Sequence, residues 1–214
     1  MVKVKICGIT REDDLKAAVD AGVDSLGFVV GVPSSQRNLQ LSEAKSLIAE
    51  ASKSVNTVAV TIFKNMERLK QISKQTNADY LQIHGSFPEL TLDPALRKRI
   101  IGVVDARADD ALELAVTYSG IFNSVLIDTA GDDGVGGTGL THNWNLSRRI
   151  REVIYPVPLI LAGGLSPENV DEAIHRVRPY GVDVSSGVER SPRIKDHEKM
   201  FEFVAKAKEA RVYE

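Results

Sequence analysis

The residues best suited to chemistry stand where short apolar segments end. Cys7 is the only cysteine of the 214-residue chain; it closes the segment 2–7 and is followed at once by Gly8. Asp128 closes a second segment, 124–128, directly after a valine, a leucine and an isoleucine. A thiolate can act as a base or nucleophile, and a partly buried carboxyl can donate a proton near neutral pH. The pair offers a general base and a general acid if the fold brings them together.

Each residue also has an ordinary structural interpretation. A lone cysteine is most often a small buried hydrophobic residue. A carboxylate after an apolar strand often only caps the following loop, which is as compatible with Asp128 as an acid role is. Asp105 also ends a segment, 101–105, and is an alternative acid, although its neighbour Arg107 favours a salt-bridged turn.

Two glycine- and serine-rich turns indicate a phosphate site. Gly163 and Gly164 follow the segment 158–162, and the residues after the segment 181–184 are Ser185, Ser186 and Gly187. Glycine lets backbone N–H groups approach phosphate oxygens, and serine adds hydroxyl donors. The alternative is a pair of ordinary tight turns.

Two further residues are candidates for binding the rest of a ligand. Arg37 lies in the loop after segment 25–30 and could hold a carboxylate with two hydrogen bonds, although a solvated arginine is the simpler interpretation. Asp183 lies within segment 181–184 and could hold a hydroxyl group of the ligand, or only a barrel-end hydrogen bond.

The elements that must position these residues alternate along the chain. Eight strand-like segments each precede a helical segment. Helix starts are expected near Thr10, Ser42, Asn65 and Ser166, and a helix interrupted by Pro94 is expected over 88–99. Eight such units of about 27 residues predict a single (β/α)₈ barrel domain over residues 1–214, with an open doubly wound sheet as the alternative. Because the active site of such a barrel lies at the carboxyl ends of its strands, the candidates would share one face. The glycine-rich loop 129–141 would close over it as a lid.

Composition excludes several classes of function. The net charge is −2, so the chain has no basic footprint for nucleic acid or an anionic membrane. One cysteine cannot form an intrachain disulfide, and there is no apolar run long enough to span a bilayer, so we expect a cytoplasmic protein. His84, His142, His175 and His197 are scattered, and we expect neither a metal nor a cofactor.

Five motifs together resemble one enzyme family, phosphoribosylanthranilate isomerase of tryptophan biosynthesis. They are Lys-Ile-Cys-Gly-Ile-Thr at 5–10, Gln-Ile-His-Gly at 82–85, Gly-Gly-Thr-Gly at 136–139, Leu-Ala-Gly-Gly-Leu at 161–165 and Val-Asp-Val-Ser-Ser-Gly-Val-Glu at 182–189. They run in order from one end of the chain to the other. The resemblance implies a (β/α)₈ barrel that carries out a cofactor-free Amadori rearrangement of a small phosphosugar, N-(5-phosphoribosyl)anthranilate, as a monomer or homodimer.

The resemblance also implies roles for the candidate residues. Asp128 would be the general acid, protonating the furanose ring oxygen, and Cys7 the general base, removing the proton at C2 of the sugar. Arg37 would bind the anthranilate carboxylate, and the two turns would bind the phosphate. The alternatives are another phosphosugar barrel, such as an epimerase or the histidine-pathway Amadori isomerase, and a phosphate-binding barrel without catalytic activity.

Overall fold

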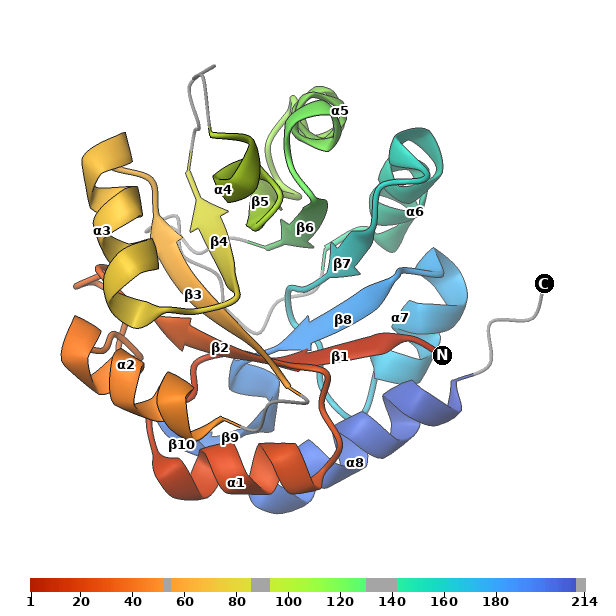
Figure 1. Cartoon of the computed structure of the whole chain (residues 1–214). Helices are drawn as coiled ribbons and strands as arrows, with labels where there is room; N and C mark the ends of the chain where they lie inside the picture. Colours follow the sequence, from red (N-terminus) through yellow and green to blue (C-terminus); the bar gives the residue numbers. More distant parts are fainter. Residues whose placement is uncertain (52–54, 86–92, 130–141, 211–214) are drawn as a thin grey trace.

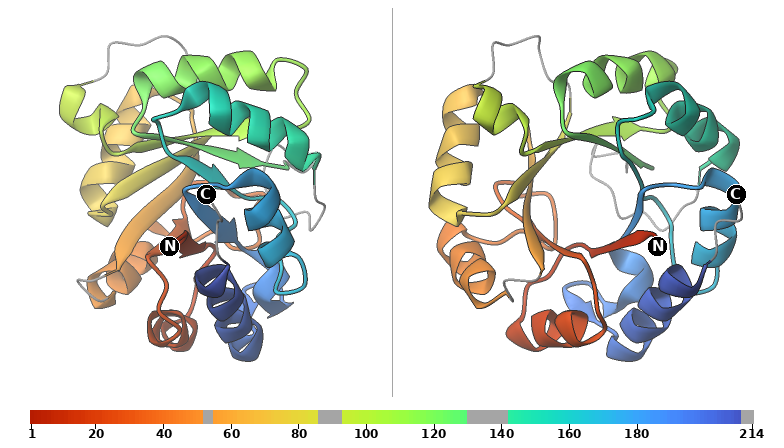
Figure 2. Two further views of the ribbon diagram at one scale, coloured as in Figure 1. Left: turned by 90° about the vertical axis from the view of Figure 1, so that its right-hand side faces the viewer. Right: turned by 45° about the vertical axis from the view of Figure 1, so that its right-hand side comes forward.

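The chain folds into a closed barrel of eight parallel strands, shown in Figure 1. The structure is a computed structural model and describes residues 1–51, 55–85, 93–129 and 142–210. Each strand pairs with its neighbours in chain order, and β1 also pairs with β8, which closes the ring. The strands form the inner ring and the helices the outer one (Figure 2). The predicted (β/α)₈ barrel is confirmed, and the open-sheet alternative is wrong.

The barrel strands are short and carry the expected apolar sequences. They are β1 (Lys3–Ile6), β2 (Ser25–Val29), β3 (Asn56–Ile62), β4 (Tyr80–His84), β5 (Ile100–Asp105), β6 (Ser124–Asp128), β7 (Leu159–Leu161) and β8 (Gly181–Val184). The helices that cover them are α1 (Glu12–Asp20), α2 (Leu41–Glu50), α3 (Met66–Thr76), α4 (Pro94–Arg97), α5 (Ala111–Ile121), α6 (Trp144–Ile154), α7 (Val170–Val177) and α8 (His197–Glu209).

Alternation along the strands divides the apolar residues into two cores. The larger core packs the outward side chains of the strands, such as Val4 and Ile6, against the helices. A smaller core inside the barrel contains Cys7, Val60 and Leu126 with other inward side chains. Because successive side chains of a strand point to opposite faces, Lys3, Lys5 and Cys7 all belong to the inward face of β1 and its continuation. A buried lysine therefore lies one inward position below the thiol.

Several helices begin at other residues than the sequence predicts. Arg11, not Thr10, precedes α1, and the Thr10 hydroxyl instead donates to the Arg193 carbonyl at 2.9 Å. Gln40 rather than Ser42 caps α2, through a capping box with Glu43. The Asn65 cap of α3 is confirmed, since its side chain accepts a bond from the Arg68 N–H.

The helices α4 and α7 are also shorter than predicted. Pro94 starts α4 instead of interrupting a longer helix, with Asp93 as its cap, and residues 86–92 lie outside the described part of the chain. Residues 167–169 after Ser166 form turns, so α7 begins only at Val170.

A short hairpin follows β8 that the sequence analysis does not anticipate. A 3₁₀ turn, η1 (Ser186–Val188), leads into the antiparallel strands β9 (Glu189–Ser191) and β10 (Ile194–Lys195). This hairpin precedes α8 and lies near the loop between β2 and α2, where Arg193 donates to the Gln36 carbonyl at 3.2 Å. It brings Glu189 and Lys195 to the carboxyl end of the barrel.

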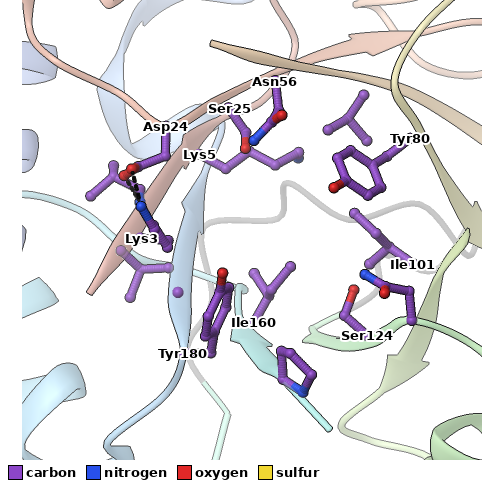
Figure 3. Close-up of a pocket in the computed structure, with 16 residues that line it drawn as sticks. Lys3, Lys5, Asp24, Ser25, Asn56, Tyr80, Ile101, Ser124, Ile160 and Tyr180 are labelled. Carbon is purple, nitrogen blue, oxygen red and sulfur yellow. Dashed lines mark hydrogen bonds and ion pairs between the residues drawn. The ribbon is translucent and has the colours of Figure 1, made fainter. Parts of the chain in front are cut away.

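The amino end of the barrel holds a cavity of about 210 Å³. Figure 3 shows residues from the starts of several strands around it, including Lys5, Tyr80, Ser124 and Tyr180. At its rim Lys3 Nζ pairs with Asp24 at 2.9 Å. The candidate catalytic residues lie at the opposite end, where the chemistry of a (β/α)₈ barrel is carried out. In the described residues, no helix has the length and apolar character needed to span a bilayer.

Candidate active site

A pocket at the carboxyl end of the barrel brings most of the candidate residues together. Its lining includes Cys7 from the end of β1, Asp128 from β6 and Asp183 from β8. The other predicted site residues that line it are Arg37, Gly163, Gly164, Ser185 and Ser186. Asp105 is not part of this lining. Its Oδ1 lies 3.5 Å from Arg107 Nε, in agreement with the salt-bridged turn that the sequence favours. The spatial prediction that a thiol and a carboxyl share one opening is therefore met.

Cys7 is buried but not sealed from the pocket. It is 7% exposed, belongs to the small inner core and lines the pocket. Burial raises the pKa of its thiol above the ordinary value, and the positive charge of Lys5 is the strongest influence that lowers it. The sulfur is thus a protonated thiol at neutral pH in the substrate-free protein, and it must lose this proton before it can act as a base.

Asp128 has the environment of a proton donor. It is 8% exposed, and burial raises its pKa to about 6, with the Asp183 carboxylate adding to the rise. The backbone N–H of Thr129 donates to Asp128 Oδ1 at 2.7 Å, and this hydrogen bond lowers the pKa of Asp128 but does not cancel the rise. A carboxyl with such a pKa can still deliver a proton near neutral pH.

Asp183 is held by a buried ion pair. Lys5 Nζ donates to its Oδ2 at 2.8 Å, and both side chains are almost fully buried. Its other oxygen, Oδ1, is buried and has no hydrogen-bond partner within the described part of the protein. Burying a carboxylate oxygen without a hydrogen-bond partner costs free energy. A ligand that donates a hydrogen bond to this oxygen would recover that cost.

The two glycine-rich turns lie in direct contact. A Cβ on Gly187 would come within 2.0 Å of the Leu165 carbonyl oxygen, which leaves room for glycine alone. Gly163 has a φ of +83°, and a Cβ there would come within 2.7 Å of the Thr129 nitrogen. Among the backbone bonds of the described residues, none is donated by the N–H groups of Gly163 or Gly164. The turns after β7 and β8 thus form one cradle, in which the N–H groups of Gly163 and Gly164 donate no backbone bond to a described residue.

Arg37 lies in the pocket but is already paired. Its Nε and Nη2 donate to the two oxygens of Glu189 at 2.7 and 2.6 Å. Lys195 Nζ donates to Glu189 Oε1 at 3.1 Å and to the Ser185 carbonyl at 2.9 Å. Burial opposes ionisation of Glu189, but these bonds hold its pKa below the ordinary value. One edge of the guanidinium is therefore occupied, and a ligand carboxylate would meet the edge that includes Nη1.

Gln82 and His84 complete the lining from β4. His84 Nε2 lies 3.1 Å from Gln82 Nε2, and burial lowers the pKa of His84 to about 4, so the ring is neutral. Gln82 Oε1 is a second buried oxygen without a partner among described residues. Within the same residues no group of three histidine, cysteine or acidic side chains is arranged to hold a metal ion.

Comparison with known proteins identifies the family. The sequence model described as N-(5'-phosphoribosyl)anthranilate (PRA) isomerase matches residues 4–206. A curated relative from Haloferax volcanii, named N-(5'-phosphoribosyl)anthranilate isomerase, is 41% identical over 212 residues, covering 99% of this chain and 95% of the relative. The chain belongs to the N-(5'-phosphoribosyl)anthranilate isomerase family. It is an isomerase of tryptophan biosynthesis, as the resemblance implies.

Solved structures of the family share the fold. A monomeric form of the dimeric Thermotoga maritima phosphoribosylanthranilate isomerase has a TM-score of 0.83 at 34% identity, covering 98% of this chain and 100% of that one. A phosphoribosylanthranilate isomerase in complex with reduced 1-(o-carboxyphenylamino)-1-deoxyribulose 5-phosphate has a TM-score of 0.83 at 35% identity, covering 97% and 99%.

Sequence reasoning missed four polar residues of this family member's site: Lys5, Gln82, Glu189 and Lys195. For Lys5 and Gln82 a signal exists, because each stands two positions before the residue that ends its apolar segment, Cys7 or His84, and so shares the face of that residue. Glu189 is the last residue of the motif at 182–189, which marks the residue but not its contact with Arg37, and Lys195 has no such signal; both reach the site through the unexpected hairpin. The predicted lid, 129–141, lies outside the described residues except for Thr129, whose Oγ1 is 3.0 Å from His142 Nδ1.

Proposed function

We propose that this protein rearranges N-(5'-phosphoribosyl)anthranilate to 1-(o-carboxyphenylamino)-1-deoxyribulose 5-phosphate, with Asp128 as general acid and Cys7 as general base. The observation that carries the assignment is that these two groups, from β6 and the end of β1, line one pocket beside the glycine-rich cradle. The family relationship supports the substrate, and the pocket geometry supports the roles.

The two groups suit the two proton transfers. Asp128 protonates the furanose ring oxygen; the bond from C1 to that oxygen breaks as the anilino nitrogen lone pair forms an iminium with C1. The iminium acidifies the hydrogen on C2, so a modest base such as the Cys7 thiolate can remove it. The resulting enolamine takes a proton at C1 as the C2 hydroxyl becomes the ketone. No step requires a metal or a nucleotide cofactor.

The remaining residues suit substrate binding. The N–H groups of the Gly163–Gly164 turn and the turn of Ser185, Ser186 and Gly187 would bind the phosphate. Asp183 Oδ1 would accept a bond from a sugar hydroxyl, since it has no partner among the described residues. The guanidinium of Arg37, fixed by Glu189, would meet the anthranilate carboxylate.

The test follows the loss of phosphoribosylanthranilate fluorescence with the wild type and with Cys7→Ala, Asp128→Asn and Asp105→Asn. We expect turnover in the wild type, a loss of about a hundredfold or more in the first two variants, and near wild-type turnover in Asp105→Asn. Asp105 is the matched control, because it ends the neighbouring strand β5 but does not line the pocket. Wild-type protein without turnover would refute the function, and active Cys7→Ala or Asp128→Asn would refute the roles.

We also propose that the enzyme works in the cytoplasm as a monomer or a homodimer. The dimeric state named for the Thermotoga maritima relative supports the second form. Light scattering coupled to size-exclusion chromatography decides between them.

A further inference from the structure

Lys5 lies in the interior of the barrel, between its two ends. Its side chain lines the cavity at the amino end, where Figure 3 shows it among the residues that surround that space. Its Nζ, however, bonds Asp183 Oδ2 at 2.8 Å, and Asp183 lines the pocket at the carboxyl end. Only about 5% of the Lys5 side chain is exposed. A buried ammonium group thus faces the active site from beneath.

The same ammonium group is close to the Cys7 sulfur. A Cβ placed on Gly27 would come within 2.8 Å of Cys7 Sγ and 3.0 Å of Lys5 Nζ. The nitrogen and the sulfur therefore both border the space above Gly27 and are at most 5.8 Å apart, the sum of those two distances. Glycine on β2 leaves the space that lets them approach.

Other charged groups around Cys7 do not supply the same stabilisation. Lys195 and Arg37 also favour an ionised sulfur, but they share the carboxylate of Glu189, which offsets one of their two positive charges, and Lys195 lowers the pKa of the thiol less than Lys5 does. Asp183 disfavours a second negative charge nearby. Burial lowers the pKa of Lys5, but the attraction of Asp183 and Cys7 outweighs it and the pKa is raised, so Lys5 keeps its charge.

We propose that Lys5 is a positioning residue of the active site, whose buried ammonium group stabilises the Cys7 thiolate and fixes the Asp183 carboxylate beside it. The proposal rests on the proposed base role of Cys7 for its catalytic meaning. When the thiol gives up its proton, the ion that forms is already opposite a positive charge. Without Lys5 the same ion would form in a buried space next to a carboxylate.

The test measures the ionisation of the thiol directly in the substrate-free protein. Cys7 is the only cysteine, so the ultraviolet absorbance of thiolate against pH, with Cys7→Ser as the blank, reports this residue alone. For Lys5→Met we expect the pKa of the Cys7 thiol to rise by about 1 unit or more, as for loss of an opposite charge within 4–6 Å. Lys3→Met is the matched control: it removes a lysine from the same strand, but one that pairs with Asp24 at the far end of the barrel.

A double variant covers the case in which Lys5→Met fails to fold. Lys5→Met with Asp183→Asn removes both charges of the buried pair and leaves no carboxylate without a counter-ion. Its thiol pKa should lie above that of the wild type and below that of Lys5→Met. A shift in Lys5→Met no larger than in Lys3→Met, or a double variant at or below the wild-type value, would overturn the proposal.

Kinetics provide a second and separable result. If Cys7 is the base, Lys5→Met lowers kcat more than it changes KM, because the thiolate acts in the proton transfer and not in binding the substrate ground state. A wild-type protein without turnover would refute the proposed function but leave the thiol titration valid. An unshifted thiol with normal turnover would refute only the role of Lys5.

Discussion

Asp128 and Asp183, the two carboxyl groups that face the pocket, differ in the groups that stabilise their negative charge. Asp183 has the Lys5 ammonium group at 2.8 Å, whereas the hydrogen bond that Asp128 accepts within the described residues comes from the N–H of Thr129 at 2.7 Å. Burial without a paired cation is what keeps a carboxyl protonated toward neutral pH. Burial raises the pKa of both carboxyls, but only Asp183 has a cation that opposes the rise through a direct hydrogen bond, and the proposed division of labour, with Asp128 giving a proton and Asp183 holding the substrate, rests on that difference.

The raised pKa of Asp128 makes its ionisation costly to the fold. In the folded protein the pKa of Asp128 is about 6, above the ordinary 3.8. The protonated carboxyl therefore makes its full contribution to the free energy of unfolding below pH 3.8, and this contribution is lost as the pH rises through 6. Asp128→Asn should therefore raise the free energy of unfolding by about 3 kcal/mol at pH 8 and by almost nothing at pH 4. Urea denaturation across this range measures it. A stabilisation that does not change with pH would contradict the environment described for Asp128.

Glu189 should control substrate binding through Arg37. Glu189→Gln removes the charge that fixes the guanidinium and leaves Lys195 buried without its counter-ion. We expect KM for phosphoribosylanthranilate to rise about ten- to hundredfold, as for loss of a charged hydrogen bond, with a smaller change in kcat. Glu172→Gln, which breaks only the exposed pair with Arg176, is the control and should leave both constants unchanged. An unchanged KM in Glu189→Gln would show that Arg37 needs no partner to act.

At the scale of elements, the turns after β7 and β8 act as one unit. The turn after β8 can lie against Leu165 only because Gly187 has no side chain. The sheet places the two strands side by side, with Ile160 opposite Gly181 and Leu161 opposite Val182. The cradle is therefore a product of strand register together with one glycine.

Gly187→Ala should separate these turns. A methyl group there meets a backbone carbonyl that cannot move alone, so we expect a loss of about 1–3 kcal/mol in the free energy of unfolding. Binding of inorganic phosphate, followed by calorimetry, should weaken in parallel. The matched control is Gly120→Ala on the exposed side of α5, where a Cβ meets nothing within 4 Å and helix propensity predicts a gain of about 1 kcal/mol. Equal phosphate affinity in Gly187→Ala and wild type would argue against the cradle.

Much of the element pattern could be predicted because it is local. Apolar segments such as 124–128 and their terminal residues follow from residue type, and alternation with helices fixes the barrel. Helix starts are less predictable: Thr10 has a good capping side chain but bonds Arg193, 183 residues away. The partners of the predicted site residues are also distant in sequence and so were not predictable. Lys5 meets Asp183, and Arg37 meets Glu189, only when the barrel closes. The catalytic candidates were visible at strand ends, but the charges that tune them were not.

At the scale of the molecule, Asp24 ties the two ends of the described chain to the sheet. It accepts bonds from Lys3 Nζ at 2.9 Å and from the Val4 N–H at 2.8 Å, and it also pairs with Lys208 of α8. One carboxylate before β2 thus joins the first strand to the last helix. Burial alone would raise the pKa of Asp24, but these bonds lower it.

Asp24→Asn should weaken this junction in a pH-dependent way. The pKa of Asp24 is lowered in the folded protein. The ionised carboxylate therefore contributes to the free energy of unfolding above pH 3.8, and this contribution is lost as the pH falls through the pKa of the folded protein. We expect the free energy of unfolding to fall by about 1 kcal/mol at pH 7, a modest value because solvent screens the partly open carboxylate, and the gap to close toward pH 3. Asp13→Asn, whose pair with Arg11 is exposed, serves as the control. Thermal unfolding measures both variants. If Asp24→Asn and Asp13→Asn lost the same stability at each pH, the proposed stabilising role of Asp24 would be contradicted.

The pairing of β1 with β8 also sets when this enzyme can begin to work. During translation Lys5 and Cys7 leave the ribosome 178 residues before the carboxylate that neutralises Lys5. Until then the nascent strand has one open edge and its ammonium group stays hydrated. A chain halted before residue 181 would hold the thiol, the acid and one glycine turn, yet it would have no enclosed space in which they could meet. Activity should therefore emerge only once β8 has been made and has paired with β1.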